Sequence, residues 1–333
     1  MKHLQRIQNY DQLKILADAR RLTILQHLMV KPATLSQLGL LLDEHPAKIR
    51  HHLKQLEVAG LIELVDTRVV RGFVEKYYSA RARAYTLQEI ILPASTKPIT
   101  FVAIGSHDLA LELLAERLPE FGQDTEAEIL TIPVGSLEGL MALRQGTAQL
   151  AGCHLLDIES GEYNLPYVRH FFPDRSISLL TLAHREQGLL LAPDNPFGIR
   201  DISDLAGADI RFVNRNKGSG TRLWFDLKLD QLGLPSESIN GYGHEVRTHT
   251  LVAQTILRGL ADAGIGLRAS AQQHDLDFVP LFQERYDLVI PQEQLENRYL
   301  LPILEKIQSG GFRKHVQHLA GYDTAHTGEV IRP

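Results

Sequence analysis

Apolar residues recur at helical spacing through the N-terminal part of the chain. Residues 10–30, YDQLKILADARRLTILQHLMV, carry such a pattern with one polar interruption, which predicts two helices rather than a strand. A third helix is expected in KPATLSQLGLLLD, where Thr34 fits the start. A fourth is expected in PAKIRHHLKQLEVAG, with Pro46 in its first turn and Gly60 as its stop. Two strand-like runs then flank DTRVVRG.

This order of elements is that of a winged helix-turn-helix, a mainly α domain with a β wing. The fourth helix would bury Ile49, Leu53 and Leu56 and turn a basic face outward. We expect that face to enter the major groove of DNA, and two wing arginines to meet phosphate or the minor groove. The predicted DNA contacts are Lys48, Arg50, His51, Lys54, Arg68 and Arg71. A helical packing module whose charges are only solvated is the alternative.

Beyond residue 98 the pattern changes to alternating strands and helices. ITFVAIGSHDLALELLAERL contains an apolar strand, a Gly-Ser turn and an amphipathic helix, and EILTIPVGSLEGLMALRQG repeats that plan. Such alternation predicts an α/β domain with a mainly parallel sheet. SISLLTLAHREQGLLLAP and DLDFVPLFQERYDLVIP each contain two strand-like halves, the first around Arg185 and the second around a polar break at residues 283–285. Two such passes would take the chain from one lobe to another and back.

These patterns divide the chain into two domains joined by a linker. We expect the winged helix over residues 1–92, the linker over 93–98 and the α/β domain over 99–333. The first lobe of the α/β domain would comprise 99–183 and 285–333, and the second lobe 184–284.

Composition narrows the class of protein. The net charge of -5 hides an asymmetry, because basic residues outnumber acidic ones over 1–92 and the reverse holds beyond. A basic module of this kind indicates a polyanionic partner. The single cysteine, Cys153, stands in an apolar run, which predicts a packed thiol and excludes a disulfide within the chain. Because we find neither a signal-like segment nor about 20 consecutive apolar residues, we expect a cytoplasmic protein without a membrane partner.

Three expected strand-to-helix turns of the second domain carry Ser or Thr beside glycine. These residues are Ser106, Ser136 and the pair Ser219 and Thr221, and Arg222 follows the third turn. Helix capping explains any one of them. Helix N-termini grouped at the carboxyl ends of strands also attract a small anion, so we expect a clamp for one. The run GSGTR lacks the lysine of a P-loop, which disfavours a nucleoside triphosphate.

A fourth helix start in RTHT and two weaker positions complete the expected ligand contacts. A structural role is equally compatible with His154, and Tyr322 can pack beneath a cleft. Glu245 and Arg247 can instead pair with each other. The full set of predicted contacts is Ser106, Ser136, His154, Ser219, Thr221, Arg222, Thr248, His249, Thr250 and Tyr322.

The N-terminal segments resemble a known family. ADARRLTILQHL, TLSQLGLLL, PAKIRHHLKQLEVAGLIELV and VRGFVEKYY are similar to the winged-helix domain of ArsR-type bacterial repressors over residues 10–85. The resemblance implies a homodimer that binds double-stranded operator DNA. The chain departs from the metal sensors of that family, because no cysteine precedes Cys153 and the adjacent His51 and His52 point apart on a helix. We therefore expect no metal site and no cofactor.

The second domain resembles a different family. GSHD, AGCHLLD, HREQGLLLAPDNPFGI, DLAGADIRFVNRNKGSGTRLWFD and GYGHEVRTHTLVAQTILRGLADAGIG are similar to the periplasmic-binding-protein-like domain found fused to helix-turn-helix regulators and to molybdopterin-biosynthesis proteins. The resemblance implies a type II fold, with two lobes hinged by two crossovers. Similar turns in tungstate- and molybdate-binding proteins imply a tetrahedral oxyanion, molybdate or tungstate, as effector. A small organic acid or a molybdenum-cofactor precursor is the alternative.

We therefore predict a one-component transcriptional regulator in which an effector closes the two lobes and changes how paired winged helices meet DNA. A transport receptor would carry the same clamp, but it would need a signal peptide and would have no use for residues 1–92. An enzyme would need an acid–base pair or an activated nucleophile. His249 with Glu245 is a candidate pair, yet the turns are poor in carboxylates, so we expect no enzymatic activity.

Overall fold

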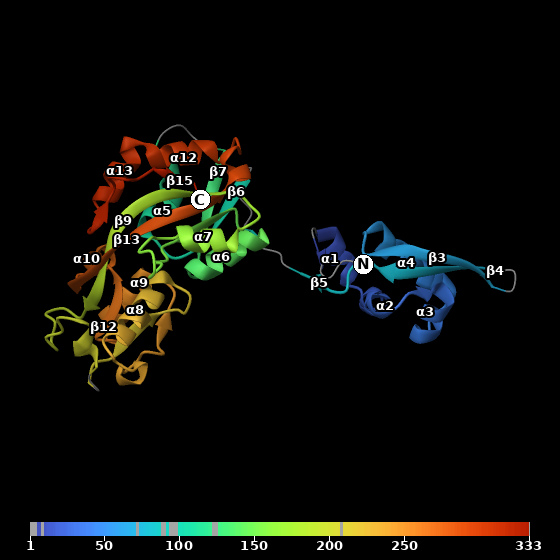
Figure 1. Cartoon of the computed structure of the whole chain (residues 1–333), viewed down its shortest axis with the longest axis horizontal. Coiled ribbons are helices and arrows are strands. Elements are labelled where there is room, and N and C mark those ends of the chain that lie inside the picture. The colour runs from blue at the N-terminus through green and yellow to red at the C-terminus, as the bar shows by residue number, and fades with distance from the viewer. Residues whose placement is uncertain are drawn as a thin grey trace. The chain divides into compact units, whose positions relative to one another are not determined.

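The computed structural model of the chain forms two compact units, Met1–Leu92 and Pro93–Pro333 (Figure 1). Each unit has its own hydrophobic core. The structure describes residues 5–7, 10–70, 73–87, 91–92, 99–121, 126–206 and 209–332. The expected linker over 93–98 and the expected DNA contact Arg71 lie outside the described residues.

The first unit contains the expected helices and hairpin. Its helices are α1 (Tyr10–Leu16), α2 (Ala19–Val30), α3 (Leu35–Leu42) and α4 (Pro46–Val58). The strands β3 (Ile62–Val70) and β4 (Phe73–Ala80) form an antiparallel hairpin, and β2 (Ala33–Thr34) pairs with β4. The short strands β1 (Gln5–Arg6) and β5 (Tyr85–Thr86) pair in parallel.

Local capping explains where these helices begin and end. Asp18 starts α2 by accepting hydrogen bonds from two backbone N–H groups of the first turn, and Thr34 forms a capping box with Gln37 at the start of α3. Pro46 is the first residue of α4, and Gly60 follows that helix with a φ of +69°, a left-handed conformation that glycine adopts without strain. The predicted helices are confirmed.

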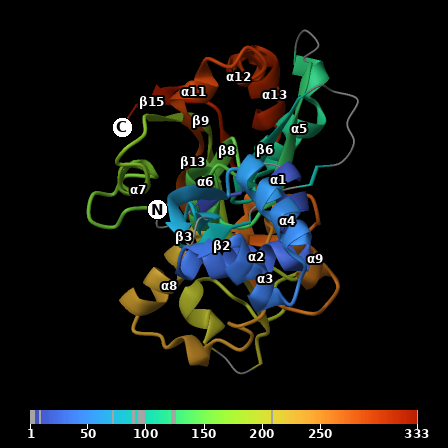
Figure 2. The same cartoon turned by 90° about the vertical axis from the view of Figure 1, so that its right-hand side faces the viewer.

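The second unit consists of two α/β lobes joined by long strands. One lobe contains β6 (Ile99–Gly105), α5 (Leu109–Glu116), β7 (Ala127–Pro133), α6 (Ser136–Gln145), β8 (Leu150–Cys153), α7 (Leu165–Phe171), α11 (Gln292–Leu295), α12 (Leu301–Gln308) and α13 (Gly310–Gln317). The other contains β10 (Phe212–Arg215), α8 (Gly220–Gln231), β11 (Glu245–Val246), α9 (His249–Leu257), β12 (Ala263–Leu267) and α10 (Arg268–Gln272). Figures 1 and 2 show α12 and α13 at the opposite end of this unit from α8.

The long strands β9 (Ile177–Leu191) and β13 (Asp277–Pro291) run through both lobes. They pair with each other in antiparallel register, with Arg185 opposite Glu284. The polar break predicted at residues 283–285 is therefore wrong, because β13 is continuous there apart from β-bulges on either side. The two strand-like stretches predicted around Arg185 form one continuous strand, β9. The polar residues of both strands lie where the two lobes meet.

The sheet is mixed rather than mainly parallel. Among the described residues its order is β11-β10-β12-β9-β13-β8-β6-β7, and the short β14 (Tyr322–Asp323) and β15 (Val330–Ile331) also pair with β9. Pairing is parallel within each lobe, from β6 to β7 and β8 and from β10 to β11 and β12. It is antiparallel around β9 and β13, because the chain crosses to the second lobe in one strand and returns in the other. No helix in the described ranges has the length and hydropathy of a membrane span.

Candidate functional site

Turns from both lobes contact one another at the carboxyl ends of their strands. The N–H of Leu137 in α6 donates to the carbonyl of Gly218 at 3.2 Å, and the side chain of Asn216 contacts the carbonyl of Val134. A Cβ atom placed on Gly220 would lie 2.3 Å from the carbonyl oxygen of His154. The N-termini of α6 and α8 therefore meet closely across the lobe junction, and only glycine fits at Gly220.

A chain of hydrogen bonds joins Ser106, His154 and Glu284 in this junction. The Ser106 Oγ lies 2.6 Å from Nε2 of His154, and Glu284 Oε2 lies 2.7 Å from Nδ1 of the same ring. All three side chains are buried. Burial is the main cause that lowers the pKa of His154, so the ring is neutral at neutral pH. Ser106 and His154, predicted separately as ligand contacts, thus form one unit with a carboxylate from β13.

The guanidinium of Arg185 holds two buried carboxylates together. Its Nε donates to Glu284 and its Nη1 to Asp108, each at 2.7 Å. Burial lowers the pKa of Arg185, but the two carboxylates outweigh burial and raise it above the usual value. The hydroxyl of Tyr322 donates to Asp108 at 2.7 Å, so the predicted contact Tyr322 joins this network at the start of α5. Nη2 of Arg185 is buried without a hydrogen-bond partner in the structure.

A second route connects Glu284 to the other lobe. The side-chain amide of Gln187 contacts Glu284, and the hydroxyl of Thr221 at the start of α8 donates to the Gln187 oxygen at 2.9 Å. Thr221 is fully buried and does not cap α8, because Ser219 accepts the hydrogen bond from the first turn of that helix. Thr221 is therefore a link in the buried network rather than a helix cap.

Arg215 is fully buried in the same junction but pairs with no carboxylate among the described residues. Its Nη1 lies 2.8 Å from Nε2 of His249, and its Nη2 donates to the carbonyl of Arg247 at 2.8 Å. Its Nε is buried without a partner. Burial, followed by repulsion from Arg185, lowers the pKa of Arg215 to about 9, a large shift for an arginine.

Two histidines lie beside Arg215. His249, the first residue of α9, is fully buried, and burial together with Arg215 places its pKa well below the ordinary value. Its backbone N–H donates to Nδ1 of His107 at 3.4 Å, and the two rings are 5.6 Å apart. Glu245 does not pair with His249, so the acid–base pair considered from the sequence is not formed in the described structure.

The guanidinium of Arg222 is already paired with carboxylates, whereas a guanidinium that holds an anionic ligand would be expected to lack such partners. Its Nε lies 2.8 Å from Asp226 and its Nη1 lies 2.9 Å from Glu245, while its guanidinium stacks 4.2 Å from the centre of the Tyr242 ring. The considered pair of Glu245 with Arg247 is thus replaced by Glu245 with Arg222. Two carboxylates already neutralise Arg222.

The remaining predicted contacts occupy the starts of three helices. Ser136 begins α6, and its hydroxyl accepts from the backbone N–H of His154 at 3.3 Å. Ser219 caps α8, and Thr248 caps α9 by accepting from Leu251. Thr250 is partly buried in the first turn of α9. For Ser219 and Thr248, helix capping is therefore an observed role, and ligand contact stays a prediction.

Sequence reasoning missed the residues that carry most of the charge. Arg185, Gln187, Arg215 and Glu284 stand within or at the end of apolar strands, and Asp108 caps α5. A charged residue inside an apolar strand is itself a signal, because burying an unpaired charge costs several kcal/mol. LAHREQGLLL and LFQERYDLV both contain such charged residues, which we interpreted only as boundaries between strand-like halves.

Cys153 lies next to this network in the core of the first lobe. Burial raises the pKa of its thiol to about 12, which keeps the group protonated and unreactive. The prediction of a packed thiol is confirmed. Among the residues that the structure describes, no cluster of His, Cys, Asp and Glu could hold a metal ion.

The predicted DNA contacts that the structure describes lie on the outer face of α4 and on the wing. Lys48, Arg50, His51 and Lys54 are exposed, whereas Ile49, Leu53 and Leu56 are buried as expected. Lys48 pairs with Glu44 at 3.0 Å and Arg68 pairs with Asp66 at 2.6 Å. The side chain of His52 is buried, whereas that of its neighbour His51 is exposed.

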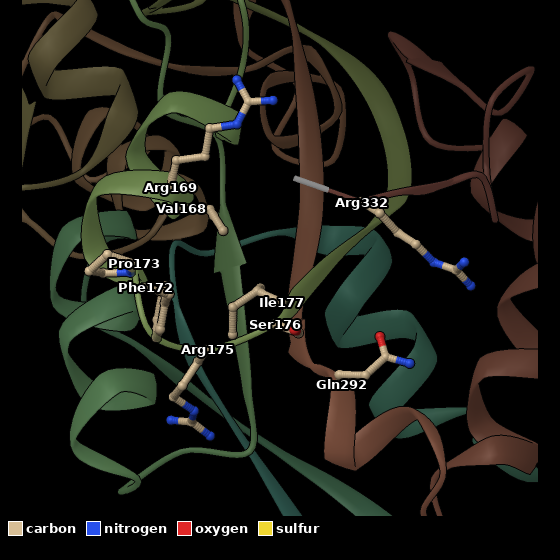
Figure 3. A pocket seen from close by; sticks show the side chains of 9 residues that line it. All are labelled: Val168, Arg169, Phe172, Pro173, Arg175, Ser176, Ile177, Gln292 and Arg332. Atoms are coloured by element: carbon tan, nitrogen blue, oxygen red, sulfur yellow. The ribbon is translucent and has the colours of Figure 1, made fainter.

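A separate surface cavity of about 570 Å³ opens between α7 and the ends of β9 and β13 (Figure 3). Three arginines, Arg169, Arg175 and Arg332, are among its lining residues, but their guanidinium groups point in different directions. Arg175 also contacts Glu293. None of the predicted ligand contacts lines this cavity.

Comparison with protein families supports both sequence resemblances. Residues 18–63 match the family described as "Bacterial regulatory protein, arsR family", and residues 119–308 match the "PBP superfamily domain". The chain is 36% identical over 230 residues to "Uncharacterized protein YvgK" of Bacillus subtilis, and this match covers 69% of this chain and 73% of that protein. It is 38% identical over 107 residues to a Clostridium pasteurianum protein encoded in the 5′ region of a 2Fe-2S ferredoxin gene, covering 32% of this chain and 95% of that protein.

Solved structures with a similar fold include binding proteins and effector domains. The tungstate ABC transporter structure from Geobacter sulfurreducens has 13% identity and a TM-score of 0.49, covering 66% of this chain and 98% of that chain. The effector-binding domain of QuiR in complex with shikimate has 14% identity and a TM-score of 0.47, with the same coverage.

Proposed function

Since the chain belongs to the PBP superfamily and carries an arsR-family DNA-binding domain at its N-terminus, we propose that this ligand-sensing transcriptional regulator responds to a small oxyanion held between its two lobes. Molybdate and tungstate are the first candidates, since the Ser, Gly and Thr turns resemble those of proteins that bind them. The regulator binds operator DNA as a homodimer, and lobe closure changes the setting of the paired winged helices.

The buried guanidinium of Arg215 carries this proposal. A fully buried cation without a carboxylate partner is costly, and an anion bound beside it would supply the missing countercharge. The unpartnered Nε of Arg215 and Nη2 of Arg185 are donors that oxyanion oxygens can satisfy. Arg215 replaces Arg222 as the principal cation of the proposed site, because Arg222 already has two carboxylate partners.

The surroundings of Arg215 fit a small anion. Helices α6, α8 and α9 all begin at this junction, and each contributes the partial positive charge of its N-terminus. Ser106, Ser136 and Thr221 add short hydroxyls from both lobes. Ligand oxygens would therefore contact both lobes at once, which couples binding to closure. The buried carboxylates Asp108 and Glu284 are already paired with Arg185 and so do not repel the anion strongly. The carboxylate of Glu138, which lies near Gly135 and Gly218, is exposed to solvent.

Isothermal titration of the full chain with molybdate, tungstate, sulfate and phosphate tests this function. We expect tight binding of molybdate or tungstate, loss of that binding in Arg215→Met, and its retention in Arg211→Met. Arg211 is the matched control, since it lies in the same lobe but at the surface, paired with Asp262. Normal binding by Arg215→Met would remove Arg215 from the site. Absence of heat with all four anions would instead favour the organic-acid alternative.

Arg222→Ala separates the two candidate cations. From the sequence, this change was expected to abolish the effector response while leaving operator binding nearly intact. With Arg215 as the principal cation, we expect Arg222→Ala to retain oxyanion binding and to lose about 2 kcal/mol of stability through its broken charged hydrogen bonds. The same titration, with a thermal melt of the variant, decides between them.

A further inference from the structure

In the Ser106–His154–Glu284 hydrogen-bond chain, the direction of the bond between Ser106 and His154 depends on one proton of the His154 ring. Its outer end is the hydroxyl of Ser106, at the strand-to-helix turn before α5, and its inner end is the buried carboxylate of Glu284. We propose that this chain is a proton relay that decides whether Ser106 accepts a hydrogen bond from the bound ligand or donates one to it. The inference rests on the proposed oxyanion site and concerns which oxyanions that site selects.

Glu284 fixes the position of the proton on the neutral ring of His154. Burial raises the pKa of Glu284, but the neighbouring imidazole and the guanidinium of Arg185 outweigh burial and lower it to about 2. An ionised carboxylate can only accept hydrogen bonds, so Nδ1 of His154 must carry the ring proton. Nε2 then has a lone pair, and the hydroxyl of Ser106 must donate to it across 2.6 Å.

The two charge states of His154 present different groups to the ligand. With a neutral ring, the Ser106 proton is committed to Nε2, so the Ser106 oxygen offers only lone pairs and requires a ligand that brings its own hydroxyl. With a protonated ring, Nε2–H donates to Ser106, and the hydroxyl proton is free to point at the ligand. A fully ionised oxyanion therefore binds together with one proton on His154, whereas a monohydrogen oxyanion binds without one.

Charged groups from every side of the ring set this balance. Arg185 on β9, Arg215 on β10 and His249 on α9 oppose a second proton on His154, and Glu284 on β13 favours it. The ring of Tyr286 stacks at 6.0 Å and completes the enclosure. A ligand anion adds opposite charge within this buried space, and such a charge within about 4–6 Å raises a pKa by about 1–3. Entry of a proton-free anion thus brings a proton with it.

The same connectivity activates a serine nucleophile in hydrolases. Here the Glu284 carboxylate is shared with Arg185 and Gln187, and burial makes His154 a weak base. The backbone N–H of Ser106 donates to the carbonyl of Gly152 at 2.9 Å, so it is not free to stabilise an oxyanion intermediate. These contacts favour a role in ligand recognition over covalent attack.

Titration calorimetry in buffers of different ionisation enthalpy counts the protons taken up per bound ion. The full chain is titrated with tungstate, which carries no proton, and with inorganic phosphate at a pH of about 8, where the monohydrogen form dominates. We expect uptake of about one proton per tungstate, none per phosphate, and a tungstate affinity that falls about tenfold for each unit of rising pH. The direction follows from linkage, because a complex that holds an extra proton is weakened as protons become scarce.

Two variants locate the proton, and a third is their control. Ser106→Ala and His154→Gln are expected to bind tungstate without proton uptake, whereas Arg211→Met, which changes a surface arginine paired with Asp262, keeps it. Tungstate binding without proton uptake in the wild-type chain, or unchanged uptake in Ser106→Ala, would overturn the relay and leave the oxyanion site standing. Absence of binding by any oxyanion would overturn the site and the relay together.

Discussion

Replacing Arg215 by methionine should stabilise the protein in the absence of ligand, although most changes at buried positions destabilise. The pKa of Arg215 falls well below the ordinary value of a guanidinium, to about 9, chiefly through burial. At about 1.4 kcal/mol for each pH unit, this fall corresponds to about 5 kcal/mol of disfavoured charge. Methionine has a similar length and no charge. It forfeits the hydrogen bonds to His249 and the Arg247 carbonyl, which costs about 1–3 kcal/mol.

The free energy of unfolding should therefore rise by about 3 kcal/mol, which is within the range found when buried charges are replaced by apolar side chains. For a unit of this size, the melting temperature changes by about 2–4 °C for each kcal/mol of stability, so we expect a rise of about 6–12 °C. Trp224, the single tryptophan, stacks on Phe282 at 3.8 Å, and its fluorescence follows unfolding of the second lobe.

Tungstate should stabilise the wild-type chain but not the Arg215→Met variant, so the difference in stability between them should disappear. Tungstate at about one hundred times its dissociation constant should stabilise the wild-type chain by about 3 kcal/mol and leave Arg215→Met unchanged. Arg211→Met serves as the control and should respond to tungstate as the wild type does. An Arg215→Met variant that melts below the wild type, or that tungstate still stabilises, would refute the claim that Arg215 is a buried charge awaiting an anion.

Three further changes probe other parts of the account. Gly220→Ala places a methyl group against the backbone of His154 and should hold the lobes apart, weakening oxyanion binding at least tenfold by calorimetry; unchanged affinity would show that the junction tolerates the group. Arg50→Ala should reduce the salt dependence of DNA binding by about one phosphate contact, whereas Lys314→Ala, on an exposed part of α13, should not. The thiol of Cys153 should react with a thiol reagent only after unfolding, so rapid labelling of the native chain would contradict its burial.

Local signals explain how much of the fold the sequence could predict. Thr34, Pro46 and Gly60 act within a few residues of their own helix ends, so the pattern placed α3 and α4 correctly. The mixed sheet could not be predicted in the same way, because the pairing of β9 with β13 joins segments about a hundred residues apart. Their antiparallel direction follows from the crossing between lobes, which periodicity does not report.

The candidate site was only partly predictable for the same reason. Ser106, Ser136 and Thr221 were accessible from the sequence, since each stands beside glycine at a strand-to-helix turn. Arg215 and Glu284 were not, because their importance depends on which other charges the fold buries beside them. The two ion pairs of Arg222 were not predicted either, since Asp226 and Glu245 become its neighbours only through α8 and the turn before α9.

Anomalous scattering from crystals of the full chain with tungstate would show whether an anion binds beside Arg215, because tungsten marks its own position. We expect one strong peak in the lobe junction, within about 4 Å of the Arg215 guanidinium and near the N-termini of α8 and α9. A peak confined to the surface cavity beside Arg169 and Arg175, or beside the Arg222 guanidinium instead of Arg215, would contradict it.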